Sequence, residues 1–190
     1  MNIGDNAFGG IVAYIYKEND LGYVIDEEHG FVVSSIDVGQ SFWGCTGWTG
    51  ASGFTIGTGY QNTLNIIENC PEEGIAARLC VNYSGGGYTD WFLPSNDEAM
   101  QFLKLYWLGF GDFVSGDTKE GVIGKYYTSS EINPYMFGNE NDENYYDYKL
   151  AFTQSIIYTP DTWINEFPNW RFFDAVPKDT ILSVRAIRYF

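Results

Sequence analysis

Short runs of β-branched and aromatic residues open the chain and alternate with polar turns. These runs cover residues 11–16, 22–26 and 31–36. Their spacing predicts a small antiparallel meander. Alternating segments return at residues 149–154 and 182–190. We expect the last of them to pair near the N-terminal strands and to close the domain.

Residues 39–60 are rich in Gly, Thr, Ser and Trp without a steady period, which predicts an irregular loop anchored by Trp43 and Trp48. Apolar residues at helical spacing then predict two short helices, divided by Pro71. The residues that define them are Leu64, Ile66 and Ile67, then Ala76, Ala77, Leu79 and Cys80.

A third helix is predicted after Ser95. The Ser95 hydroxyl and the Glu98 carboxylate have the spacing of a reciprocal capping box. Gly109 and Gly111 end the pattern. The expected apolar face consists of Ala99, Phe102, Leu103 and Tyr106.

Strands, helices, long loops and strands in this order predict an α+β fold in which helices pack on an antiparallel sheet. A chain of 190 residues suits a single domain over residues 1–190. The most polar insertion, residues 133–147, predicts a surface loop.

Several ordered motifs carry a family resemblance. They are Tyr88-Thr89-Asp90-Trp91-Phe92-Leu93-Pro94-Ser95 with Glu98, Tyr126-Tyr127-Thr128-Ser129-Ser130-Glu131, Val184-Arg185-Ala186-Ile187-Arg188-Tyr189-Phe190, Gly9-Gly10-Ile11, Trp43-Gly44, Gly57-Thr58-Gly59, Asn62-Thr63 and Cys80. With them the chain resembles, over residues 9–190, the domain family named after the C-terminal domain of bacterial collagen-like adhesins. That family also occurs in phage tail and virion proteins.

The resemblance implies a C-type-lectin-like fold, similar to that of formylglycine-generating enzymes, with long ordered loops and termini that meet in one sheet. It implies surface binding as the function. The chain departs from the family at Tyr127 and at Thr128, which replaces a Ser, and its middle loops are long. The binding specificity of the family therefore does not transfer.

The formal charge is −15, from 10 Lys and Arg against 25 Asp and Glu. This field repels phosphate backbones and anionic lipid, so we expect no nucleic-acid partner. Sulfated glycans would require a basic patch around Arg171, Lys178, Arg185 and Arg188. We expect neutral glycans or a protein partner instead. No stretch approaches the roughly 20 apolar residues that span a bilayer, so membrane insertion is not expected.

The odd cysteine count, Cys45, Cys70 and Cys80, favours reduced thiols, with a Cys70–Cys80 bridge as the alternative that leaves Cys45 free. His29, the sole histidine, lies in a predicted turn, and a solvated role is favoured over catalysis or zinc binding. For Asp90 a hydrogen bond to loop backbone is favoured over a glycosidase role.

The polar insertion offers two candidate sites. Tyr135, Tyr145 and Tyr146 could stack on sugar rings and are the predicted ligand-binding residues. Oxygen ligands at Asn139, Asn141, Asp142 and Glu143 could bind calcium, although a solvated acidic loop is favoured and no cofactor is otherwise expected. Trp43, Trp91 and Tyr126, which lie inside the family motifs, are predicted to be core residues.

These patterns support the hypothesis of a non-enzymatic phage virion protein, a receptor-binding fibre or decoration module. It would bind host-surface glycan or another virion protein through its loops. The N-terminus does not read as a signal peptide, which fits a virion protein released by lysis. Relatives often sit at the tips of trimeric stalks, so the resemblance also allows a homotrimer. The alternatives are a purely architectural capsid or tail component and a carbohydrate-active enzyme with a carboxylate pair.

Overall fold

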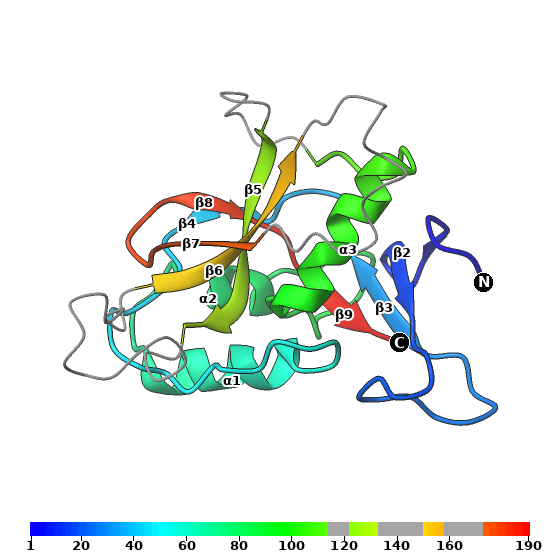
Figure 1. The fold of residues 1–190 in the computed structure, drawn as a ribbon, viewed down its shortest axis with the longest axis horizontal. Coiled ribbons are helices and arrows are strands. Elements are labelled where there is room, and N and C mark those ends of the chain that lie inside the picture. The colour runs from blue at the N-terminus through cyan, green and yellow to red at the C-terminus, as the bar shows by residue number, and fades with distance from the viewer. Residues whose placement is uncertain (114–121, 133–149, 158–172) are drawn as a thin grey trace.

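The computed structural model describes residues 1–113, 122–132, 150–157 and 173–190 (Figure 1). Within these residues the fold is α+β with antiparallel pairing and three short helices, as the sequence predicts, but the strands form two sheets where the sequence predicts one. One sheet has the order β1-β2-β3-β9, from strands Asn6–Ala7, Gly10–Ile15, Gly30–Val33 and Ile187–Tyr189. The other has the order β4-β8-β5-β6-β7, from strands Gly39–Ser41, Leu182–Val184, Val122–Glu131, Leu150–Ile157 and Phe173–Pro177. Pairing is antiparallel except for one parallel bridge between β5 and β8.

The chain termini meet in the four-stranded sheet. β9 pairs with β3, with Phe31 opposite Tyr189 and Val33 opposite Ile187. The Phe8 and Phe190 rings stack with centroids 4.5 Å apart. The N- and C-termini therefore lie on the same side of the molecule (Figure 1). The prediction that the C-terminal strand pairs with the N-terminal strands is confirmed.

The predicted strand over residues 22–26 is wrong. These residues belong to a turn-rich connection between β2 and β3. Asn19, Gly22 and Asp26 have φ angles of 87°, 98° and 62°, and an extended strand cannot accommodate left-handed residues at this spacing.

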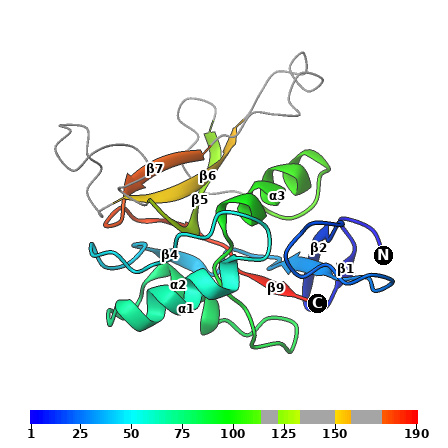
Figure 2. The same ribbon diagram turned by 60° about the horizontal axis from the view of Figure 1, so that its bottom comes forward.

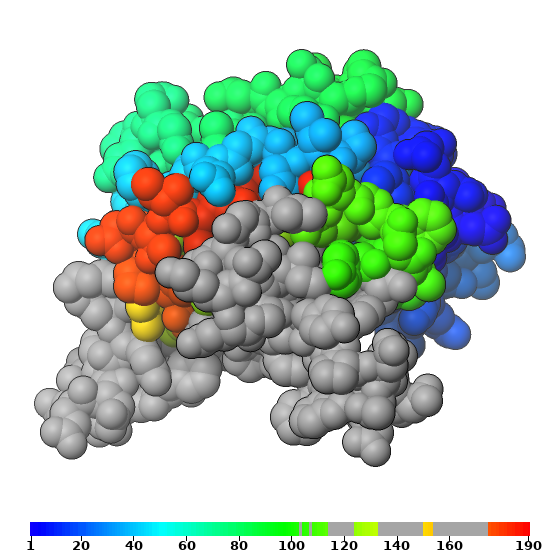
Figure 3. Space-filling model, turned by 90° about the horizontal axis from the view of Figure 1, so that it is seen from above, coloured from blue at the N-terminus to red at the C-terminus, as the bar shows by residue number. Residues whose placement is uncertain are grey.

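The three helices confirm the predicted ones, with α1 over Gly59–Asn69, α2 over Ala76–Val81 and α3 over Asn96–Trp107. At the start of α3 the Ser95 hydroxyl accepts from the Glu98 amide, and the Glu98 carboxylate accepts from the Ser95 amide. Helix α3 contacts β2 of one sheet and β5 and β6 of the other, so it lies between the sheets (Figure 2). Seen from above, α3 and the residues after it lie beside the N-terminal residues (Figure 3).

Aromatic side chains fill the interior. Trp43, Trp91 and Tyr126 are fully or almost fully buried, as predicted. The Trp43 indole donates to the carbonyl of Thr128 at 2.8 Å and so ties residues after β4 to β5. Trp48 lies at the surface, with 39% of it exposed. Trp43 is therefore the buried anchor of this loop.

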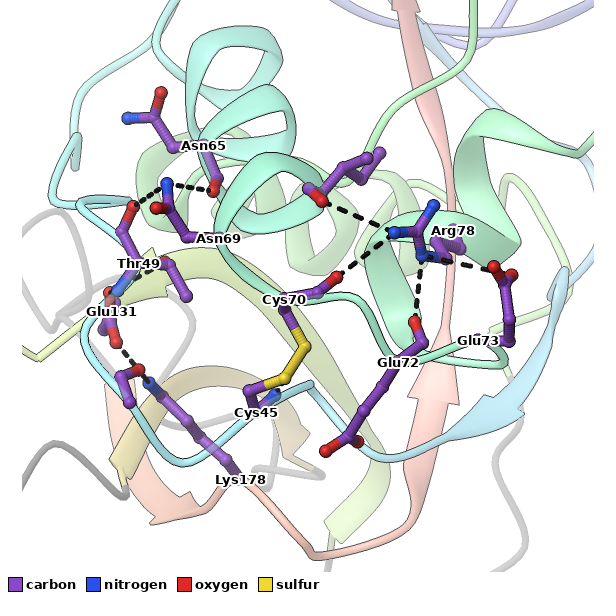
Figure 4. Close-up of a disulfide and its surroundings, with 12 residues drawn as sticks. Cys45, Thr49, Asn65, Asn69, Cys70, Glu72, Glu73, Arg78, Glu131 and Lys178 are labelled. Carbon is purple, nitrogen blue, oxygen red and sulfur yellow. Dashed lines mark hydrogen bonds and ion pairs between the residues drawn. A yellow bond between two sulfur atoms is a disulfide. The ribbon is translucent and has the colours of Figure 1, made fainter.

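The cysteine predictions are wrong, both for reduced thiols and for the Cys70–Cys80 alternative. Cys45 and Cys70 form a disulfide, and Cys80 is a buried free thiol (Figure 4). Helix α2 turns Cys80 into the core, while the chain after β4 passes the C-terminus of α1. The Cα atoms of Cys45 and Cys70 are 5.5 Å apart there, a distance that a disulfide spans.

Candidate functional site

The polar insertion begins and ends at adjacent backbone positions. β5 ends at Glu131, β6 begins at Leu150, and the Ile132 amide donates to the Leu150 carbonyl at 3.4 Å. The two residues that flank residues 133–149 therefore lie side by side where β5 ends and β6 begins, inside the five-stranded sheet.

All residues of the two predicted sites in this insertion lie outside the described residues. They are the tyrosines Tyr135, Tyr145 and Tyr146 and the candidate calcium ligands Asn139, Asn141, Asp142 and Glu143. Both sites stay predictions, and the geometry described below concerns the base from which this segment leaves.

The polar end of β5 is bonded to chain segments on both sides. On one side, the Thr128 hydroxyl donates to the Phe152 carbonyl of β6 at 3.0 Å. On the other, the Ser130 hydroxyl donates to the Gly53 carbonyl at 2.8 Å, and the Glu131 amide donates to the Ala51 carbonyl at 2.8 Å. These short polar side chains are buried yet bonded, which is the condition for polar groups to be stable in a core.

A buried ion pair lies at the same place. The Lys178 ammonium pairs with one oxygen of the Glu131 carboxylate, and both side chains are fully buried (Figure 4). The other oxygen accepts from the Thr49 amide and the Thr49 hydroxyl, each at 2.9 Å. Lys178 also donates to the Gly47 carbonyl at 2.9 Å and lies 4.4 Å from the Trp43 ring centroid. Burial lowers the pKa of Lys178, and the hydrogen bond and charge of Glu131 oppose that shift.

The residues from Cys45 to Gly53 connect this base to helix α1. The Cys45–Cys70 disulfide joins one end of the segment to the end of α1 (Figure 4). The Asn65 and Asn69 amides of α1 donate to the carbonyls of Gly50 at 3.0 Å and Thr49 at 3.3 Å. The base of the polar insertion is therefore cross-linked to a helix as well as to the sheet.

The basic patch that sulfated glycans would require does not form from the described residues. Arg185 is buried, pairs with Asp37 and lies 4.3 Å from the Phe113 ring centroid. Lys178 is buried in the pair with Glu131. Arg171 lies outside the described residues. Lys178 and Arg185 connect distant parts of the fold and are not displayed to solvent.

Asp90 has a structural backbone hydrogen bond, as predicted, and its larger partner is the Arg188 guanidinium, which the sequence does not predict. Arg188 donates to the two Asp90 oxygens at 2.7 and 2.8 Å, and its guanidinium carbon lies 3.9 Å from the Tyr88 ring centroid. The hydrogen bond from Arg188 lowers the pKa of Asp90. The first and last of the three long family motifs are thus joined by a charge-assisted bidentate contact.

The other titratable groups with several partners also have structural contacts. His29 lies in the connection between β2 and β3, directly before β3 and past the turn where it was predicted, with Nδ1 3.1 Å from the Phe190 carbonyl and Nε2 2.8 Å from the Glu27 carboxylate. Its hydrogen bond with Glu27 raises the pKa of His29.

Glu98 accepts from the amides of Gly57 and Ser95 and from the Tyr189 hydroxyl, at 2.7 to 2.8 Å. Burial raises the pKa of Glu98, and these hydrogen bonds oppose that shift.

One group of potential metal ligands occurs among the described residues, formed by Cys45, Cys70 and Glu72. The two sulfurs are already joined in the disulfide, so they are not available as thiolates. In the described part of the chain, no helix is both long and apolar enough to cross a membrane.

Sequence reasoning missed one exposed apolar segment. Leu21, Tyr23, Val24 and Ile25 are all exposed on the β2–β3 connection. The available signal was the run of turn-forming residues at Asn19, Gly22 and Asp26, which marks these residues as loop.

No protein-family model matches the sequence, and no curated protein sequence matches it. The resemblance to the adhesin C-terminal domain family stays a prediction.

Proposed function

We propose that this protein is a non-enzymatic binding domain of a phage virion, a fibre or decoration module with a C-type-lectin-like fold. It recognises a neutral host-surface glycan through residues 133–149. The observation that carries this proposal is the fixed base of that segment, where the Ile132 amide meets the Leu150 carbonyl beside the Lys178–Glu131 pair.

A fixed base favours binding because recognition loops are effective when a rigid scaffold positions them. The ends of the segment are joined by backbone pairing, and the base is cross-linked to α1 through the disulfide. Less conformational freedom is then lost when a ligand binds.

The sequence of the segment suits a sugar ligand. Tyr135, Tyr145 and Tyr146 supply aromatic faces that can stack on the apolar face of a sugar ring. The chain carries a formal charge of −15, while Lys178, Arg185 and Arg188 are buried in ion pairs. This charge distribution supports a neutral glycan over a sulfated one.

Calcium is a candidate part of the same site. Asn139, Asn141, Asp142 and Glu143 offer the oxygen ligands that calcium prefers. Added calcium should raise the melting temperature of the parent protein and not that of the D142N/E143Q variant. An equal effect on both, or none on the parent, excludes calcium at these residues.

The test is binding of the fluorescently labelled protein to a panel of bacterial cells, before and after periodate oxidation of their surface glycans. We expect binding to at least one strain, its loss on oxidation, and its loss in the Y135A/Y145A/Y146A variant. F42A is the matched control because the Phe42 side chain is an exposed aromatic that follows β4. Its binding should equal that of the parent.

Binding that survives oxidation refutes glycan recognition, and equal loss in F42A refutes the assignment to residues 133–149. The domain family to which the chain is similar suggests a homotrimer, in which weak single-site contacts would gain from multivalency. Light scattering that gives a monomer at micromolar concentration would contradict self-assembly.

A second candidate function is an architectural role, in which the domain holds a neighbouring virion protein. The specific observation in its favour is the exposed apolar run from Leu21 to Ile25, because proteins bury such runs against partners. Absence of binding to every cell tested would support this function over glycan recognition.

A further inference from the structure

The connection between β2 and β3 exposes an unusual share of its apolar side chains. The exposed fractions are 61% for Leu21, 42% for Val24 and 74% for Ile25, and Tyr23 is 39% exposed. The connection projects from the four-stranded sheet beside the chain termini (Figures 1 and 2). Apolar groups gathered at one exposed place mark interaction sites more often than single scattered ones do.

This connection is held in one conformation by polar contacts. One oxygen of the Asp20 carboxylate accepts from the Tyr14 hydroxyl at 2.9 Å and from the Lys17 amide at 2.8 Å. The Tyr23 amide donates to the Asp20 carbonyl at 3.1 Å. At the far end, the His29 ring contacts the Phe190 carbonyl. The exposed apolar side chains are therefore displayed by an ordered loop.

Close backbone approaches also fix this loop. Gly22 has a φ of +98° and lies under the Tyr16 ring, so that a Cβ there would be 3.0 Å from a ring carbon. A Cβ on Gly57 would lie 2.5 Å from the Leu21 carbonyl oxygen. Close contacts with Tyr16 and Gly57 therefore restrict the conformation of the loop. This restriction lowers the conformational entropy that is lost on docking.

Acidic residues flank the apolar run. Glu18, Asp26, Glu27 and Glu28 are exposed in the same connection, although Glu28 lies 3.4 Å from the N-terminal ammonium and Glu27 lies 2.8 Å from His29. Charge complementarity therefore favours a partner whose apolar recess is lined by cations. An anionic lipid surface would be repelled by these carboxylates.

A second copy of the chain is a poor partner for this surface. Lys178, Arg185 and Arg188 are buried in ion pairs, and Arg78 donates to the carbonyls of Glu72 and Cys70, so that Lys17 and Lys104 are the exposed cations among the described residues. Docking of two acidic chains here would bring like charges together.

We propose that residues 18–28 form a docking surface for a separate protein that presents an apolar recess flanked by lysine or arginine side chains. This inference rests on the architectural role described above and names the class of its partner, and it is independent of glycan recognition by residues 133–149. Leu21, Val24 and Ile25 enter the recess, and Glu18 and Glu28 face its cations.

The probe is a synthetic amphipathic helix of leucine and lysine, whose binding to the full chain is followed by fluorescence anisotropy. We expect the V24S/I25S variant to bind about tenfold more weakly or worse, because contacts at the centre of an interface dominate its affinity. The control is I181S, since Ile181 is 59% exposed in the β7–β8 turn and its loss should leave affinity unchanged. A leucine and glutamate helix of equal length should not bind.

Two charge-reversal variants distinguish the effect of charges at the docking surface from the effect of the net charge of the protein. E18K/E28K and E72K/E73K change the net charge equally, and all four glutamates are exposed. Both variants should weaken binding of the leucine and lysine helix through the change in net charge. Only E18K/E28K should weaken it severalfold further. Equal weakening by both variants, or unchanged binding by V24S/I25S, overturns the proposal.

Two further measurements test other occupants of the surface. Self-association of the parent in light scattering that V24S/I25S abolishes would assign the surface to a second copy and overturn the proposal. Binding to phosphatidylcholine or phosphatidylserine vesicles that V24S/I25S abolishes would assign it to a membrane, with the same consequence. The expected results are no vesicle binding and no effect of V24S/I25S on oligomeric state.

Discussion

Replacement of Lys178 by Met should destabilise the fold strongly. The Lys178 ammonium is the cationic partner of Glu131, and both side chains are fully buried. The variant leaves a buried carboxylate with only the Thr49 donors. Removal of one member of a buried pair costs about 3–5 kcal/mol. That is a large part of the roughly 5–15 kcal/mol that stabilises an ordinary domain.

Urea unfolding followed by tryptophan fluorescence measures this loss, because Trp43 lies against Lys178. The K178M/E131Q double variant should recover part of it, since a Gln at this position is neutral and can still accept from Thr49. The control is E73Q, because Glu73 is 83% exposed and 4.0 Å from Arg78. Its effect should stay within about 0.5 kcal/mol.

If K178M lowers the free energy of unfolding by less than about 1 kcal/mol, the Lys178–Glu131 pair does not stabilise the chain segments that flank residues 133–149. A double variant less stable than K178M would also contradict this role, because that result means that the uncompensated carboxylate is not the cause. A fall in the slope of the urea transition would instead point to a change in the unfolded state.

Three further predictions concern the cysteines and the histidine. C45S should lose about 3.5 kcal/mol of unfolding free energy in urea titrations, from loop-closure entropy across the 25-residue separation to Cys70. Burial raises the pKa of the Cys80 thiol, so a thiol reagent should label it only in denaturant, and labelling of the native protein would contradict its burial. The bond to Glu27 raises the pKa of His29 above 6.5, so its stabilisation is complete below pH 6.5 and is lost as the pH rises through the folded pKa. Thermal melts of the parent and H29Q should converge at high pH, and a constant difference would contradict this role.

The helices could be predicted from the sequence because their signals are local. The reciprocal contacts of Ser95 and Glu98 span three residues, and the break at Pro71 needs no knowledge of the rest of the chain. Local signals also produced the wrong prediction of a strand over residues 22–26. Their apolar content resembles a strand, but Gly22 and Asp26 hold left-handed conformations.

Long-range pairing was beyond the sequence. Lys178 and Arg188 each sit in an ordinary polar context, and their acidic partners are 47 and 98 residues away. Cys70 bonds to Cys45 because of the approach between the loop and α1, which spacing does not encode.

The described part of the candidate site could not be predicted for the same reason, and its tyrosines stay a prediction outside the described residues. Tyr135, Tyr145 and Tyr146 stand out by composition, since aromatic residues beside a polar run are unusual. The base depends on tertiary contacts of Glu131 with Thr49 and Lys178, which no local pattern reveals.

The two proposed interactions should differ in their dependence on salt, because few cations are exposed on the described surface. Among the described residues, Lys178, Arg185 and Arg188 are buried in ion pairs, so the described surface is more acidic than the composition alone suggests. A neutral glycan does not sense this field, and its binding should change little between low salt and 0.5 M salt. Docking of a cationic recess on residues 18–28 depends on the field and should weaken as salt shortens the Debye length to a few ångströms. A salt titration of each interaction therefore tests both assignments, because equal salt dependence would mean that the two ligands share one acidic surface.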